Sequence, residues 1–198
     1  RHLVSLVVFL PLVFGLILLA MPSKEEVAQK LLKTTALVFS LIIFLLSCAL
    51  YNGFDSTATG FQFVEKHDWV SAFGVTYTIG IDGISLLLIM LTTFLTPIVL
   101  LGSWNAIDEK LKSYLALILF LETGMLGAFV ALDVFLFYVF WEAMLIPMYL
   151  LIGVWGGPNR LYAAIKFFLY TLAGSLLLLV AMLALFFQGG ETFDILQL

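Results

Sequence analysis

Six runs of mostly apolar residues divide this sequence, and each is long enough to form a helix across a lipid bilayer. A spanning helix needs about 20 such residues, because the hydrocarbon core is roughly 30 Å thick and a helix rises ~1.5 Å per residue. The expected helices cover about residues 3–21, 34–50, 84–104, 114–131, 133–154 and 161–187. The sequence therefore predicts an all-α transmembrane fold, a bundle of about six membrane-spanning helices.

The overall composition favours the same fold class. Hydrophobic residues make up 63% of the chain and charged residues 11%, whereas an ordinary soluble domain is about 45–50% apolar and about 25% charged. A chain of 198 residues cannot hide this much apolar surface in a core of its own. We therefore expect an integral membrane protein whose main solvent is the lipid bilayer.

The polar composition argues against several classes of ligand. The chain has 9 Lys and Arg against 13 Asp and Glu, so it has no basic excess and nucleic acid is not an expected partner. Cys48 is the only cysteine, and an iron–sulfur cluster needs about four thiolates. Both histidines, His2 and His67, lie in flanking or loop sequence. We therefore expect no cofactor or metal site built by this chain alone.

The segments between the apolar runs predict local structure. Residues 51–83 are polar and mixed, so we expect them outside the bilayer, with a short hairpin around the alternating residues 76–79. Ser23 and Glu26 have the spacing of a capping box and predict a helix start there. Pro97 is expected to bend the third spanning helix.

Basic residues in the loops predict the orientation, since Lys and Arg collect on the cytoplasmic side. The other side carries Arg1 and Lys66, which puts the amino terminus outside the cytoplasm. The first residue is not Met, and we expect a piece of a longer chain. The residues that we assign to the cytoplasmic side are Lys24, Lys30, Lys33, Lys110, Lys112 and Arg160.

Four ionisable residues lie inside the apolar runs: Glu122, Asp133, Glu142 and Lys166. A charge at the middle of a bilayer costs roughly 2.5–3.5 kcal/mol on insertion scales. Such residues usually face protein or water and commonly mark ion or proton paths. They are the candidate functional residues of this chain.

Helical rise predicts the depth of the acidic residues. Asp133 lies near the outer turn between two helices, where it is expected to cap a turn or a helix start. Glu142 is then about 13 Å deeper and Glu122 about 16 Å deeper, on adjacent antiparallel helices. Two carboxyl groups that share a site of low dielectric constant do not both ionise easily. This predicts a pair suited to binding and releasing protons.

Neighbouring residues extend this hypothesis. Tyr138 and Tyr149 share a helix face with Glu142 and offer hydroxyl groups to a proton chain. Pro147 frees a backbone carbonyl near Glu142 and could admit water. Lys166 either takes part in the path or snorkels to the membrane interface. Glu122 either carries protons or pairs with a helix of a partner.

The residues around Glu142 resemble a known family. Phe135-Leu-Phe-Tyr-Val-Phe-Trp-Glu-Ala-Met-Leu-Ile-Pro-Met-Tyr149 resembles the fifth-helix signature of the antiporter-like subunits of respiratory NADH:quinone oxidoreductase (complex I). The similarity is greatest to the chain M (subunit 4) type. Residues 64–69, 77–85 and 156–170 are similar to adjoining motifs of that type, so the resemblance runs across essentially the whole chain.

The resemblance implies roles for the candidate residues. Family members hold two inverted repeats of helices that form half-channels. Their key protonatable glutamate matches Glu142, and its charge state is coupled to a lysine on a seventh helix. The fourth-helix glutamate matches Glu122, the sixth-helix lysine matches Lys166, and the acid before the signature matches Asp133. This chain holds neither the seventh helix nor the second repeat, so we expect only part of an antiporter-like bundle.

The resulting hypothesis is a proton-translocating membrane-arm subunit of NADH:quinone oxidoreductase. The resemblance implies that NADH, FMN, iron–sulfur clusters and quinone bind other subunits, that L- and N-type subunits are neighbours, and that the membrane is a bacterial or mitochondrial inner membrane. One alternative is a D-type subunit of a multi-subunit cation/proton antiporter, which would not copurify with flavin subunits. Another is a structural scaffold, which would tolerate a neutral residue in place of Glu142.

Overall fold

The computed structural model describes residues 2–23, 25–70 and 74–197, and it is mostly helical. By length and composition, six helical spans in these residues could cross a membrane. The all-α transmembrane fold class is therefore confirmed. The helices are α1 (Leu3–Ala20), α2 (Glu26–Gly53), α3 (Gly83–Gly102), α4 (Leu111–Val130), α5 (Val134–Ala143), α6 (Leu145–Trp155) and α7 (Arg160–Gln188), with α5 and α6 together forming one span.

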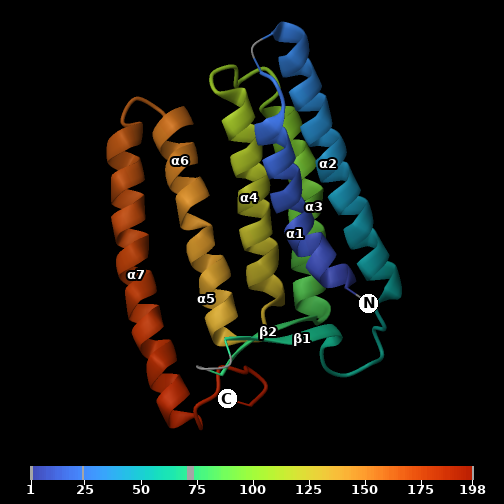
Figure 1. The fold of residues 1–198 in the computed structure, drawn as a ribbon, viewed down its shortest axis with the longest axis vertical. Coiled ribbons are helices and arrows are strands. Elements are labelled where there is room, and N and C mark those ends of the chain that lie inside the picture. Colours follow the sequence, from blue (N-terminus) through green and yellow to red (C-terminus); the bar gives the residue numbers. More distant parts are fainter. Residues whose placement is uncertain (1, 24, 71–73, 198) are drawn as a thin grey trace.

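The helices form a four-helix group and a flanking pair (Figure 1). In the group, α1 packs along α4 and α2 packs along α3. Helix α5 of the flanking pair packs against α4. Helix α7 packs mainly on α6, and most of its apolar side chains stay exposed in this chain. Apolar surface of this extent requires cover by lipid or by other protein.

A two-stranded antiparallel sheet lies across one end of the bundle (Figure 1). Strand β1 (Gln62–Val70) pairs with β2 (Val75–Ile81), so that Lys66 lies opposite Thr78 and His67 opposite Tyr77. This sheet falls in the polar segment for which a short hairpin was predicted. The loops α1–α2, α3–α4 and α6–α7 lie at the opposite end (Figure 1).

Backbone hydrogen bonds tie the sheet to two distant parts of the chain. The Leu132 N–H donates to the Thr78 carbonyl at 2.8 Å, and the Ile195 N–H donates to the Leu132 carbonyl at 3.0 Å. The Val134 N–H donates to the Phe193 carbonyl at 2.8 Å. The short link between α4 and α5 is therefore held between β2 and the segment that follows α7.

The predicted capping box at the start of α2 is wrong. The helix begins at Glu26, its N-cap residue is Glu25, and no side chain caps it. Glu25 and Glu26 are exposed, so water can bond the free N–H groups of this turn. A capping box does open α3, where the Ser85 N–H donates to Asp82 Oδ1 at 2.7 Å and the Asp82 N–H donates to Ser85 Oγ at 2.8 Å.

The predicted helix over residues 133–154 is interrupted. Helix α5 ends at Ala143 and α6 begins at Leu145, with Met144 between them outside the regular helix. Pro147 has no N–H, so it cannot bond the carbonyl of Ala143 four residues earlier. Helix α5 therefore ends one residue after Glu142, and the break lies two residues after it. Helix α3 continues through Pro97 as one element.

Candidate functional site

Asp133 is a fully buried helix cap. Its Oδ1 accepts hydrogen bonds from the N–H groups of Phe135 and Leu136, both at 3.0 Å, in the first turn of α5. Its Oδ2 accepts from the Thr76 N–H at 3.0 Å and from the Thr76 hydroxyl at 3.1 Å. The prediction that Asp133 caps a helix start is confirmed. This carboxyl group anchors α5 to strand β2.

Glu122 is the most deeply buried ionisable side chain in the middle of the bundle. It lies halfway along α4, and its side chain is 0% exposed. Among the described residues, neither of its carboxyl oxygens has a hydrogen-bond partner. The Thr96 side chain of α3 lies beside it. A buried carboxyl group without a partner is costly, so this one calls for a functional or solvent explanation.

Glu142 occupies the last turn of α5, directly before the break at Met144. It is half-buried, and its Oε1 is buried without a hydrogen-bond partner in the described part of the chain. Tyr138 lies one turn earlier on the same face. Tyr149 lies beyond the break in α6, where its ring meets Phe168 of α7 at 5.5 Å between centroids.

Helices α4 and α5 touch closely through two glycines. A Cβ atom on Gly124 would collide with Met144, and one on Gly127 would collide with Phe140. Glu142 lies between Phe140 and Met144 in sequence, so it is level with Gly124 and close in depth to Glu122. The predicted similarity of depth therefore agrees with the packing of these helices.

The two glutamates do not share a site, and that part of the prediction is wrong. Phe140 and Met144 face α4, and Glu142 is two residues from each, about 160–200° away around the helix. Glu122 likewise lies about 140–160° around α4 from Gly124 and Gly127, toward Thr96 of α3. Depth follows from helical rise alone, whereas direction depends on which faces pack together.

Ser175 of α7 is a polar residue that the sequence analysis missed. Its side chain is 3% exposed, and its hydroxyl has no hydrogen-bond partner among the described residues. The Tyr149–Phe168 contact sets the register of α6 and α7. Ser175 is seven residues after Phe168 and Glu142 is seven before Tyr149, so both lie about 10 Å from that contact in the same direction. The sequence feature that could have pointed to it is a single serine within an apolar helix.

Lys166 lies on the opposite face of α7. Its ammonium group lies over the Tyr162 ring at 5.7 Å from the centroid, and both side chains are exposed. The buried face of α7 holds Ala164 and Ser175, about 160–180° around the helix from Lys166. The structure therefore does not bring Lys166 and Glu142 together by direct contact.

Within residues 2–23, 25–70 and 74–197, no group of three or more His, Cys, Asp or Glu could hold a metal ion. The three acidic residues singled out in the apolar runs do not form one cluster. Glu122 faces α3, Glu142 lies on the face of α5 that is turned away from α4, and Asp133 is saturated by donors. The chemistry that this arrangement offers is proton binding at Glu122 and Glu142.

Two family models match the chain in succession. The model described as "NADH-ubiquinone oxidoreductase chain 4, amino terminus" matches residues 6–128. The model described as "NADH:quinone oxidoreductase/Mrp antiporter, TM" matches residues 131–198. Together they account for almost all of the chain.

Individual relatives and solved structures are also similar to this chain. NADH-quinone oxidoreductase subunit M of Rhodobacter capsulatus is 46% identical over 100% of this chain and 38% of its own length. A chain of respiratory complex I from Thermus thermophilus superimposes with a TM-score of 0.83 at 31% identity, over 98% of this chain and 38% of that one. A chain of the Mrp complex from Dietzia shares the fold, with a TM-score of 0.78 at 20% identity, over 96% of this chain and 20% of that one. The chain spans less than two fifths of these relatives' length.

Proposed function

Because the chain belongs to the NADH:quinone oxidoreductase chain 4 family, we propose that it is a proton-translocating part of the membrane arm of that enzyme. One observation carries the proposal. Glu122 and Glu142 lie near the middle of apolar spans, and three of their four carboxyl oxygens are buried without hydrogen-bond partners among the described residues. A packing role would favour apolar side chains at both positions, because a buried polar group without a partner destabilises a fold.

Glu142 is the switchable proton site in this proposal. Its carboxyl group lies beside a helix break, where the carbonyl of Ala143 is left without its helical partner by Pro147. Free carbonyl groups and water at such breaks are common at ion sites inside membranes. Tyr138 and Tyr149 supply hydroxyl groups on the same side, and Glu122 is a second proton site.

Lys166 is the proposed modulator of these sites. A positive charge inside the membrane favours the ionised form of nearby carboxyl groups. Because its side chain is on the face of α7 away from α6, the influence reaches Glu142 across the helix and not by an ion pair. The redox groups (FMN, iron–sulfur clusters and quinone) and the oxidation of NADH belong to other subunits, and L- and N-type subunits are the proposed neighbours.

The proposed membrane is a bacterial or mitochondrial inner membrane. The basic residues at the two ends of the bundle support a particular orientation in it. Lys33, Lys112 and Arg160 bind the backbone carbonyls of Trp104, Met21 and Val154 at the end opposite the sheet. Lys66 is at the sheet end. We propose that the end with the three cations faces the cytoplasm or matrix. Lys24, which was assigned to the same end, lies outside the described residues.

A second candidate is a subunit of a cation/proton antiporter without a dehydrogenase. The superposition on the Mrp chain supports it at the level of fold alone. Copurification separates the two. A complex I subunit should purify with flavin-containing partners and NADH oxidation activity, whereas an antiporter subunit should purify without them.

The test of proton translocation is Glu142→Gln in the full-length chain within its complex. Glutamine keeps the shape and hydrogen bonding of the side chain but cannot titrate. We expect normal assembly on native gels and a loss of NADH-driven proton translocation of about tenfold or more. Glu142→Asp should keep much of the activity, and Glu25→Gln, at an exposed helix end, is the matched control. Full activity of the assembled Glu142→Gln enzyme would favour a structural scaffold.

A further inference from the structure

The segment after α7, residues 189–197, turns back to the sheet end of the bundle (Figure 1) and contacts both α5 and α7. Phe193 is 5% exposed, and its ring stacks on Phe186 of α7 with 4.4 Å between centroids. The same ring meets Phe135, in the first turn of α5, at 5.8 Å. Helix α7 packs mainly on α6 and only slightly on α5. Phe193 of this return segment therefore joins the sheet ends of α5 and α7.

The backbone of the return segment is fixed at both ends. At its start, the Glu191 N–H donates to the Phe186 carbonyl at 2.9 Å. Gly190 (φ 89°) and Glu191 (φ 59°) are left-handed there, and this turn reverses the direction of the chain. A residue other than glycine keeps such a conformation only where its surroundings enforce it. The backbone hydrogen bonds between residues 193–195 and the link before α5 supply this constraint.

Asp194 fastens the return segment to the hairpin. Its Oδ1 accepts from the Leu196 N–H at 3.0 Å, and its Oδ2 accepts from the Lys66 ammonium group of β1 at 3.0 Å and from Gln197 Nε2 at 3.3 Å. In the described part of the chain, Lys66 is the only cation within ion-pair distance of this carboxyl group. A carboxylate with little access to water needs a counter-charge as well as hydrogen bonds. Lys66 is therefore the residue that holds the return segment to the sheet.

The spacing of α5 and α7 affects the surroundings of Glu142. A groove of about 310 Å³ lies between α5, α6 and α7, and its lining includes Trp141, Met144 and, on α7, Phe167. Glu142 lies between Trp141 and Met144 in sequence. Phe135 is seven residues before Glu142, so the return segment contacts α5 about 10 Å from it. A change in the spacing of α5 and α7 would change the width of this groove beside Glu142.

We propose that Lys66 is a positioning residue for proton translocation: its ion pair with Asp194 holds the return segment, and the return segment sets the spacing of α5 and α7 around Glu142. The inference rests on the proposed function, because it gives Lys66 an effect on one of the two proton sites. Lys66 acts through the packing of the helices, and no proton passes through its side chain.

Three variants test the ion pair in the full-length chain within the assembled complex. Lys66→Met keeps the length of the side chain and removes its charge, and Lys66→Arg keeps the charge. Asp194→Asn keeps an acceptor for the Leu196 N–H but cannot form the ion pair. The matched control is Asp108→Asn, which breaks the Lys33–Asp108 ion pair of 3.6 Å at the opposite end of the bundle.

The spacing is measured by electron paramagnetic resonance between spin labels on two introduced cysteines in a Cys48→Ser background. One cysteine replaces Ile84 at the start of α3, and the other replaces Phe187 near the end of α7. Both side chains are exposed, so a label there disturbs little packing. The complex without the two introduced cysteines gives the background from other subunits.

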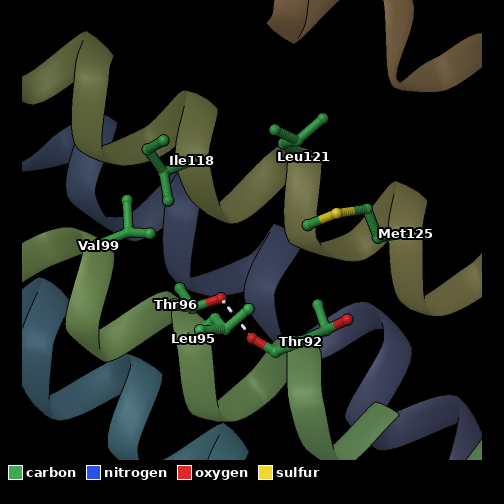
Figure 2. Close-up of a pocket in the computed structure, with 7 residues that line it drawn as sticks. All are labelled: Thr92, Leu95, Thr96, Val99, Ile118, Leu121 and Met125. Carbon is green, nitrogen blue, oxygen red and sulfur yellow. Dashed lines mark hydrogen bonds between the residues drawn. The ribbon is translucent and has the colours of Figure 1, made fainter. Parts of the chain in front are cut away.

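A second pair of labels is the internal control. Leu95 of α3 and Leu121 of α4 line a separate groove of about 230 Å³ (Figure 2). Its seven lining residues all belong to α3 and α4 and none to the return segment. The distance between labels at positions 95 and 121 should therefore stay the same in every variant.

Both variants that break the ion pair should show the same two effects. The distance between labels at positions 84 and 187 should become longer and broader. The number of protons translocated per NADH oxidised should fall by about threefold, the size expected for a half-exposed ion pair. Lys66→Arg and Asp108→Asn should match the unmodified chain. Combining Lys66→Met with Asp194→Asn should add little, because both remove one interaction.

The proton ratio separates positioning from a loss of folded protein, which would lower NADH oxidation and translocation together. Three results would overturn the inference: an unchanged distance in Lys66→Met, an unchanged proton ratio despite a longer distance, or equal effects of Asp108→Asn. The proposed function is decided separately. If assembled Glu142→Gln translocates protons at the full rate, the proposed function fails, and the label distances still decide whether Lys66 holds the return segment.

Discussion

Asp133 divides its two carboxyl oxygens between a helix and a strand: Oδ1 accepts from the first turn of α5, and Oδ2 accepts twice from Thr76 of β2. The backbone of the same link bonds to β2 on one side and to residues 193–195 on the other. The start of the helix that carries Glu142 is therefore held by parts of the chain that are far apart in sequence. This arrangement makes the sheet a support for the candidate proton site.

The first prediction concerns this support. Asp133→Ala removes a helix cap and leaves buried donors without acceptors, so we expect a loss of about 2–4 kcal/mol in the free energy of unfolding. Asp133→Asn keeps one acceptor oxygen and should lose less. Thr76→Val leaves the cap intact and should lose least. The measurement is the thermal denaturation of the purified complex, and equal effects of all three variants would contradict the order.

Sequence reasoning could predict spans and depths because these follow from local quantities. Six apolar runs predict six helices, and counting residues from Asp133 places Glu122 and Glu142 near the middle. The sequence alone could not predict that the two glutamates face in different directions. Their directions depend on the close packing of Met144 against Gly124 and of Phe140 against Gly127. Nor could the sequence predict the Lys66–Asp194 ion pair at 3.0 Å, whose partners are 128 residues apart.

The second prediction concerns orientation. In a Cys48→Ser background, a cysteine at position 66 should react with an impermeant thiol reagent added from outside, and one at position 110 should not. Lys66 is half-exposed at the sheet end, and Lys110 is exposed in the loop at the other end. Labelling both after the membrane is permeabilised controls for reactivity. The reverse pattern in intact cells would invert the proposed topology.

The third prediction concerns Lys166. If its positive charge modulates the proton sites, Lys166→Ala should lower proton translocation by about threefold, whereas Lys166→Arg should stay near the unmodified rate. Lys30→Ala removes an exposed lysine near the start of α2 and is the matched control. The assay is the number of protons translocated per NADH oxidised. Equal activity of the Ala and Arg variants would leave Lys166 as an interfacial residue.

The last prediction joins Ser175 to Glu142. Each has a buried oxygen without a partner in the described residues, and the register of α6 and α7 brings them to the same level. Ser175 is buried on a helix that is otherwise largely exposed, so α5 and α6 must cover it. A hydroxyl group there can donate to an ionised carboxylate or accept from a neutral one. Ser175 is thus suited to stabilise Glu142 in both states, directly or through one water molecule.

Ser175→Ala should therefore lower proton translocation by about tenfold at normal assembly, because one hydrogen bond to the proton site is lost. Ser175→Thr keeps the hydroxyl and should restore most of the activity. Gly174→Ala is the matched control, since a Cβ atom at that position meets no neighbouring atom. Combining Ser175→Ala with Glu142→Gln should add little to the loss caused by Glu142→Gln alone, because the hydroxyl acts through the titrating carboxyl group. Additive losses in the double variant would show that Ser175 acts on a different site.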